Sequence, residues 1–500
     1  MRTWLIITGC SLVCLGGCRT LKSKETVQLN RDGPSLSCSE KALSKSLAHY
    51  GQGLIYDAID QTDSTRTISE MRLALDYAPD NHDLHTRVAV IALKREMPQT
   101  AVEALEESYR HDRKSYQRCM NLATVYQVAG ETDNAISQYK KTLRIKDTEA
   151  AVYVALARLY FLSDKDEEAF KTLKKGRKHS EDPALIQFYL YEQSKQFLAK
   201  NELKRAIAGF KALALWDEAK RPQLYQLIGE IFIAQNNAPD AADILYKATQ
   251  LPSPIPANFI TLAAIYLQYD INKGLNVLKA AERQFPDDKD VLFALGCLYS
   301  DLEDYPKAIP LFEAAKTNAA LAATNTLGAP VLSQDFYLYH GAAYERTGNI
   351  KKAEEIFEEC LQIYPDSHHI LNYQAYMWAE AGTNLDKALH YINRALKLKP
   401  VNPAYIDTLG WIYFKQKKYD EALRYIKKAR KLIGPDPEIL HHLGDIYYAL
   451  DDTQQAVANW KRSYRLDPGN KIVAHKLVEQ GINLSLININ KTDILPQPSK

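Results

Sequence analysis

A small residue recurs along most of this chain at a nearly constant interval, and this periodicity limits the possible folds more than any other feature. The ladder consists of Ala101, Ala135, Ala169, Ala206, Ala241, Gly274, Ala308, Ala353, Ala388, Ala422 and Ala456. Successive members lie 33 to 37 residues apart, apart from one interval of 45. Periods of this size are typical of stacked helical hairpins, since a single hairpin cannot bury its apolar face alone. The sequence therefore predicts an all-α solenoid.

A second ladder, interlocked with the first, places a small residue on the first helix of each hairpin and an aromatic residue three positions later. Its pairs are Ala123 and Tyr126, Ala157 and Tyr160, Gly229 and Phe232, Ala263 and Tyr266, Gly296 and Tyr299, Gly341 and Tyr344, Ala375 and Trp378, Gly410 and Tyr413, and Gly444 and Tyr447. Two helices that cross closely need a small side chain at the crossing, and the ring one turn later fills the space between units. We therefore expect each unit to be a pair of antiparallel helices, A and B.

The last units resemble the tetratricopeptide repeat (TPR). The segment 405–423 and the segment 443–469 both come close to the consensus of that family. The resemblance implies a right-handed superhelical solenoid of about twelve TPR helix-turn-helix repeats between residues 40 and 470.

The ladders also predict how the chain is organised. We expect an N-terminal TPR array over 40–315, an insertion over 316–333 that accounts for the long interval, and a C-terminal TPR array over 334–470. A capping helix is expected over 471–480, because a solenoid needs a polar outer face at its end. Residues 481–500 are predicted to be a tail.

The N-terminus has the pattern of a targeting segment. Arg2 precedes an apolar run that is too short to span a bilayer comfortably and ends in Leu-Gly-Gly-Cys at residues 15–18. This ending resembles the lipobox of bacterial lipoproteins, which implies a signal peptide over 1–17, a lipidated Cys18, and a tether over 18–39. Arg19 stands where inner-membrane retention signals place Asp, so we expect attachment to the periplasmic face of the outer membrane. The alternative is an ordinary cleaved secretion signal.

Charge and motif content exclude several classes of function. A formal net charge of +2 argues against nucleic-acid binding, which usually needs a marked basic excess. The pairs His368-His369 and His441-His442 lack a third ligand at metal spacing, and adjacent residues point to different faces of a helix. No Gly-rich phosphate loop or nucleophile elbow is found in the sequence. We therefore predict no enzyme activity, no metal and no cofactor.

The TPR resemblance implies that helix A lines a concave face, with groove positions three residues before, one after and four after the small residue of helix A. In the last three units these positions combine rings with amide, carboxylate and imidazole groups, which suits a polypeptide partner. The predicted partner-binding residues are Asn372, Tyr376, Asp407, Trp411, Phe414, His441, Asp445 and Tyr448. Trp411 is expected to lie open in the groove; the alternative is a core residue packed between units.

The chain as a whole resembles the outer-membrane TPR lipoprotein adaptors of C-terminal processing proteases. The resemblance rests on the lipobox, the repeat array, and the motifs Asn372-Tyr373 and 407–411. It implies a membrane-anchored scaffold that binds partner polypeptides and tethers a periplasmic protease together with its cell-wall hydrolase substrates. Two alternatives stay open: a scaffold in envelope or exopolysaccharide assembly, and a TPR-fused glycosyltransferase, for which the repeats leave no room. The basic stretch 415–431 is interpreted as a solvated helix face, with lipid or an acidic partner as the alternative.

Overall fold

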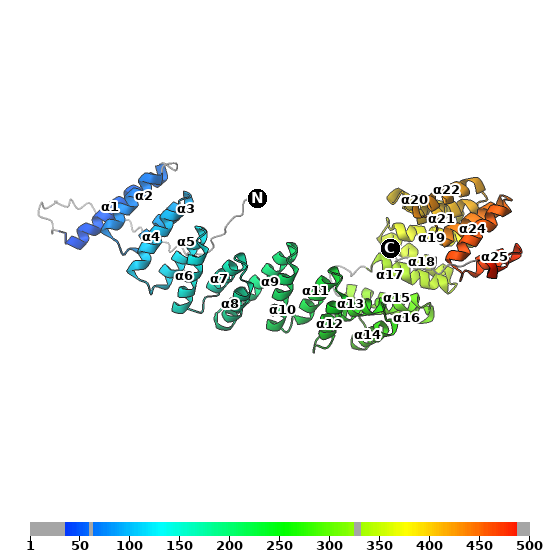
Figure 1. The fold of residues 1–500 in the computed structure, drawn as a ribbon, viewed down its shortest axis with the longest axis horizontal. Helices are drawn as coiled ribbons and strands as arrows, with labels where there is room; N and C mark the ends of the chain where they lie inside the picture. The colour runs from blue at the N-terminus through cyan, green and yellow to red at the C-terminus, as the bar shows by residue number, and fades with distance from the viewer. Residues whose placement is uncertain (1–35, 60–63, 325–331, 488–500) are drawn as a thin grey trace. The chain divides into compact units, whose positions relative to one another are not determined.

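The computed structural model describes residues 36–59, 64–324 and 332–487, and the regular structure in these ranges is entirely helical (Figure 1). The chain divides into two compact units, unit 1 over residues 1–196 and unit 2 over residues 197–500. Unit 1 contains α1 (Cys38–Ile59), α2 (Ser64–Tyr77), α3 (His82–Lys94), α4 (Pro98–His111), α5 (Tyr116–Val128), α6 (Thr132–Ile145), α7 (Ala150–Leu162) and α8 (Asp166–His179). Helix α9 (Pro183–Ala199) runs across the boundary between the units.

Unit 2 contains the remaining helices. They are α10 (Leu203–Trp216), α11 (Arg221–Ala234), α12 (Ala238–Thr249), α13 (Pro256–Leu267), α14 (Ile271–Gln284), α15 (Lys289–Asp301), α16 (Tyr305–Thr324), α17 (Gln334–Arg346), α18 (Ile350–Ile363), α19 (His368–Ala381), α20 (Leu385–Leu398), α21 (Pro403–Lys415), α22 (Tyr419–Ile433), α23 (Pro437–Ala449), α24 (Thr453–Leu466) and α25 (Lys471–Glu479), followed by the 3-10 turn η1 (Leu484–Leu486).

Consecutive helices pack as hairpins within each unit, and the hairpins stack. An odd-numbered helix serves as helix A and the next even-numbered helix as helix B, as in α7 with α8 or α21 with α22. Helix A of one repeat also contacts helix A of the following repeat, as α19 does with α21 and α21 with α23. The predicted all-α solenoid of helix-turn-helix repeats is therefore confirmed.

The two ladders occupy the positions where helices approach most closely. Every alanine of the first ladder is fully buried. Glycines on helix A face large side chains on helix B: a Cβ added to Gly341 would lie 2.2 Å from the Phe357 ring, and one added to Gly444 would lie 2.3 Å from the Trp460 ring. Since no real Cβ tolerates such contacts, the glycines set the distance between the two helices of a hairpin.

The turn from helix A to helix B has a recurring backbone conformation. In most hairpins the residue five positions before the first-ladder residue adopts a positive φ, as at Glu96 (58°), Asp164 (55°) and Lys417 (60°). Gly130 and Gly348 hold the same position in two other repeats. A residue in the left-handed backbone conformation ends helix A and reverses the chain direction. The turn therefore depends on backbone geometry and tolerates different side chains.

The long ladder interval corresponds to an extended helix. Helix α16 has 20 residues, whereas its partner α15 has 13. Residues 325–331 of the expected insertion lie outside the described residues, as do the predicted signal peptide, Cys18 and residues 488–500 of the tail. Among the described helices, none is both long and apolar enough to cross a bilayer.

Candidate partner-binding groove

Three helices A of unit 2 carry all eight predicted partner-binding residues. They are α19, α21 and α23, and each contacts the next. The starts of the last two are fixed in the same way: the side chains of Asn402 and Asp436 accept hydrogen bonds from the first turn, and Pro403 and Pro437 follow at the first helical position. Because the same N-cap arrangement begins α21 and α23, both helices start at the same position of the repeat. Residues at equivalent repeat positions of the two helices therefore lie side by side.

A cavity of about 210 Å³ lies across these three helices. Its lining residues are Asn372, Tyr373, Tyr376, Ala404, Asp407, Thr408, Ile433, Asp436, Glu438 and Ile439. Three predicted residues, Asn372, Tyr376 and Asp407, therefore lie at one cavity. The side-chain oxygen of Asn372 is buried and has no hydrogen-bond partner among the described residues. Since buried polar atoms are rarely left unpaired, this oxygen is an acceptor available to a ligand donor.

Tyr376 connects two repeats at the edge of this cavity. Its hydroxyl donates a hydrogen bond to Glu438 Oε1 at 2.7 Å, from helix A of one repeat to helix A two repeats further on. Burial, followed by the nearby Glu438 carboxylate, raises the pKa of Tyr376. The hydroxyl therefore stays protonated and keeps its role as donor. Asp436 and Glu438 make this edge of the cavity acidic.

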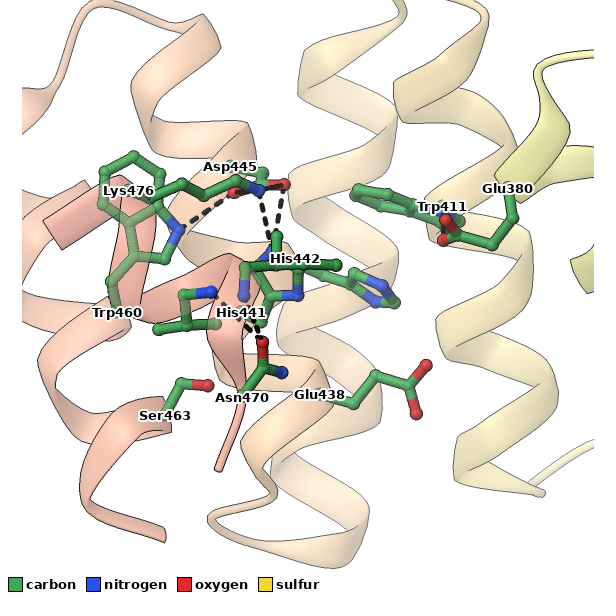
Figure 2. A network of polar contacts seen from close by, with 12 residues as sticks. Glu380, Trp411, Glu438, His441, His442, Asp445, Trp460, Ser463, Asn470 and Lys476 are labelled. Carbon is green, nitrogen blue, oxygen red and sulfur yellow. Dashed lines mark hydrogen bonds and ion pairs between the residues drawn. The ribbon is translucent and has the colours of Figure 1, made fainter. Parts of the chain in front are cut away.

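Trp411 does not lie open in the groove as expected. Its side chain is 4% exposed. The indole Nε1 donates to Glu380 Oε1 at 2.5 Å, and the ring stacks on Phe414 at 4.6 Å and on His442 at 3.9 Å between centroids. The physical reason is that helix A of the next repeat places His442 directly over the indole, so the position that faces outward in one isolated repeat is covered in the stack (Figure 2).

Asp407 and His442 form a buried hydrogen-bonded pair next to Trp411. Asp407 is 6% exposed and His442 is 1% exposed, and the imidazole Nδ1 lies 3.0 Å from Asp407 Oδ2. Burial alone lowers the pKa of His442, but the Asp407 carboxylate, with support from Glu438 and Glu380, outweighs it, so the pKa of His442 is raised. A protonated imidazole stacked on an indole gains a cation–π attraction, which favours the buried pair further.

His441 and Asp445 are covered by the last helix. Lys476 of α25 places its ammonium 2.5 Å from Asp445 Oδ2 and 2.8 Å from His441 Nε2 (Figure 2). Trp460 Nε1 also donates to Asp445, at 2.9 Å. Burial lowers the pKa of His441 to about 4, with Asp445 opposing the shift and Lys476 adding to it. Neutral His441 therefore accepts a hydrogen bond from Lys476, and α25 occupies this end of the groove.

The two remaining predicted residues differ in accessibility. Phe414 is half-buried because one face of its ring lies on Trp411. Tyr448 is 48% exposed, with its ring centroid 5.5 Å from that of Trp460. The open part of the site therefore consists of the cavity around Asn372 and Tyr376, together with the exposed ring of Tyr448.

Several residues of this site were not found by sequence reasoning. Glu380, Glu438, His442 and Lys476 lie outside the three groove positions, and their partners are 31 to 62 residues away in the chain. No local signal identifies such contacts. In the described part of the chain, no three His, Cys, Asp or Glu side chains come close enough together to hold a metal ion.

Comparisons with known proteins agree with the observed fold. A family model described as anaphase-promoting complex, cyclosome, subunit 3 matches residues 381–463, and two tetratricopeptide-repeat models match residues 270–323 and 335–367. The chain is 24% identical over 323 residues to the TPR repeat-containing protein MJ1428 of Methanocaldococcus jannaschii, which covers 61% of this chain and 54% of that protein. The chain thus spans about half the length of this curated relative.

Solved structures of repeat proteins are similar over most of the chain. The APC/C hetero-tetramer Cut9-Hcn1 has a TM-score of 0.43 at 14% identity, covering 90% of this chain and 97% of that one. Yeast Tom70 has a TM-score of 0.33 at 15% identity, covering 88% of this chain and 97% of that one.

Proposed function

We propose that the chain is a tetratricopeptide-repeat protein that acts as a lipid-anchored scaffold in the bacterial envelope, binding partner polypeptides on the helix A face of its last repeats. The cavity across α19, α21 and α23 is the observation that supports the binding site most directly. Its volume of about 210 Å³ falls below the ~300–1,000 Å³ of small-molecule pockets, so it suits one side chain of a larger partner.

The chemistry of the cavity suits a polypeptide. The unpaired oxygen of Asn372 can accept a backbone N–H of an extended segment. Tyr373 and Tyr376 supply aromatic surface, and Ile433 and Ile439 supply apolar surface for a side chain. Rings and aliphatic groups around a few fixed polar atoms are the usual composition of the centre of a protein interface.

Asn372→Ala tests this site without disturbing the fold. Because the Asn372 oxygen has no hydrogen-bond partner among the residues that the structure describes, its removal is expected to leave the melting temperature nearly unchanged. Partner capture should weaken by about fivefold to tenfold, as for loss of one interface hydrogen bond of ~1–1.5 kcal/mol. Asn393→Ala is the matched control, since Asn393 is an exposed residue of helix B that bonds only its own helix. If both variants captured the partner equally well, the cavity would not be part of the binding site.

The anchor is proposed from the Leu-Gly-Gly-Cys sequence at residues 15–18. Cys18→Ser should abolish incorporation of a labelled fatty acid and move the protein out of the membrane fraction, or leave an uncleaved precursor. Acylation with more than one chain would be needed for stable attachment, because a single chain binds membranes only marginally. A wild-type protein that fractionates as soluble and unlabelled would refute the anchor and leave the groove proposal untouched.

The identity of the partner is proposed from the whole-chain resemblance. We infer that the scaffold tethers a periplasmic protease and the cell-wall hydrolases that it degrades. Affinity purification of the full chain from detergent-solubilised membranes, compared with Asn372→Ala, is the test. Recovery of a protease or hydrolase that depends on Asn372 supports this role. Recovery of polymer-synthesis proteins would instead favour the second candidate, a scaffold in envelope or exopolysaccharide assembly.

A further inference from the structure

Two neighbouring helices of unit 1 carry an unusual concentration of positive charge. Residues 140–146 of the α6 region contain four Lys or Arg, residues 171–179 of α8 contain five, and neither stretch contains Asp or Glu. The whole chain, by contrast, is almost balanced, with 63 basic and 61 acidic residues. Helices α6 and α8 are helix B of two consecutive repeats, with α7 between them. Unit 2 has a comparable basic stretch at residues 415–431, but in unit 1 two such stretches lie on the helices B of consecutive repeats.

A groove of about 660 Å³ lies between these two helices, and we call it the basic groove. On α8 its lysines follow the spacing i, i+3, i+4, i+7, which places them on one face of the helix. The two cations on α6 are four residues apart and likewise share a face. The lining cations are Lys140, Arg144, Lys171, Lys174, Lys175 and Lys178.

None of these six side chains has a charge partner among the described residues. No ion pair is found for any of them within the described part of the chain, although Lys146, just outside the groove, pairs with Glu149. Among the described residues no Asp or Glu lines the groove, although Asp147 lies 3.4 Å from the imidazole of His179, which does line it. Six cations around one groove repel one another, and a bound anion relieves that repulsion. The arrangement therefore favours an anionic ligand over an empty groove.

The floor of the basic groove is apolar and contains an unpaired hydroxyl. Leu143, Leu156, Tyr153 and Tyr160 form it. Tyr153 is fully buried, and its hydroxyl has no hydrogen-bond partner among the described residues. Burial, together with the nearby Asp147 carboxylate, raises the pKa of Tyr153, so the hydroxyl keeps its proton and can donate to an anionic oxygen. This is an observation independent of the lysines, and it points to the same kind of ligand.

We propose that the basic groove binds an acidic polypeptide segment of a partner protein, with carboxylates facing the lysines and an apolar side chain on the floor. Lys171 to Lys178 covers seven residues of helix, ~10 Å, which matches about three residues of extended chain. A bilayer surface is flat and cannot fill a recessed floor, and Leu143 and Leu156 suit an aliphatic side chain better than a nucleic-acid backbone. The site lies in unit 1 and is independent of the groove of unit 2.

The test measures binding of a fluorescein-labelled peptide of about eight residues, alternating Glu and Leu, to the full chain in detergent. The basic-groove variant combines Lys171→Gln, Lys174→Gln, Lys175→Gln and Lys178→Gln. Its affinity for the peptide is expected to be lower by about tenfold or more, and the salt dependence of binding should be reduced, because four screened charge pairs are lost.

The matched control removes the same number of charges from another helix B. It combines Arg424→Gln, Lys427→Gln, Lys428→Gln and Lys431→Gln on α22, all exposed side chains. This control is expected to bind the peptide as the unmodified protein does. An equal loss of affinity in both variants would show unspecific attraction and overturn the proposal.

Tyr153→Phe tests the floor separately. The hydroxyl has no hydrogen-bond partner in the described part of the chain, so this variant should melt at the same temperature or higher, yet bind the peptide about threefold to tenfold more weakly. Unchanged affinity would remove Tyr153 from the site. Vesicles of phosphatidylglycerol and a single-stranded oligonucleotide are titrated in parallel. Lysine-dependent binding to either of these, without binding to the peptide, would overturn the proposal in favour of that ligand.

Discussion

Replacing Trp411 by alanine is expected to destabilise unit 2 by about 3–5 kcal/mol, the range for truncation of a buried aromatic side chain. The indole is 4% exposed. A buried aromatic side chain removes ~150–250 Å² from water, which at ~25 cal/mol per Å² gives about 4–6 kcal/mol as an upper estimate. The stack on His442 adds to the loss, because the imidazole loses its ring contact with the indole. Glu380 is exposed, so its carboxylate returns to water and contributes little.

Chemical unfolding followed by far-ultraviolet circular dichroism measures this loss, and hydrogen exchange of the α21 and α23 amides locates it. Local measurement is needed because repeat arrays do not always unfold in one step. Trp411→Phe should lose less stability, since it keeps a ring between Phe414 and His442. If Trp411→Ala lost partner binding while its unfolding midpoint and exchange rates stayed unchanged, the packing argument would be refuted, and Trp411 would be a groove anchor as the sequence suggested.

Three further predictions follow from buried or strained positions. The pKa of His442 is raised in the folded state, so its pair with Asp407 should contribute its full stability below the ordinary pKa of 6.5. That contribution should fall as the pH rises through the higher folded pKa. Urea titrations at several pH values measure this dependence, and a His442→Gln variant should lack it. Lys417→Gly should raise the free energy of unfolding by about 0.5–1 kcal/mol in urea titrations, since φ is 60° there; a decrease would contradict the strain argument. Gly444→Ala should destabilise unit 2 by about 1–3 kcal/mol through overlap with Trp460, and an unchanged melting temperature would show that the indole can move aside.

The register of the candidate site could be predicted from the sequence, but its accessibility could not. Positions relative to Ala375 and Gly410 place Asn372, Tyr376 and Asp407 on helix A, and the structure brings all three to one cavity. The same rule places Trp411 on that face, yet the indole is buried. Whether a helix A residue stays open depends on the side chains that the next repeat lays over it, and a rule applied within one repeat contains no such information.

The sequence by itself determined the helical hairpins, their order and the close contacts within each one. The small residues at Gly341 and Gly444 and the rings that face them lie within one repeat, so a local pattern is enough to fix that distance. Only the tertiary structure decided the contacts between repeats: Tyr376 with Glu438, 62 residues apart, and Asp407 with His442, 35 residues apart. It also decided that the lysines of α8 line one groove with Lys140 and Arg144 of α6. These depend on the small rotation between successive hairpins, which arises from the packing of whole helices and leaves no periodic trace in the residues themselves.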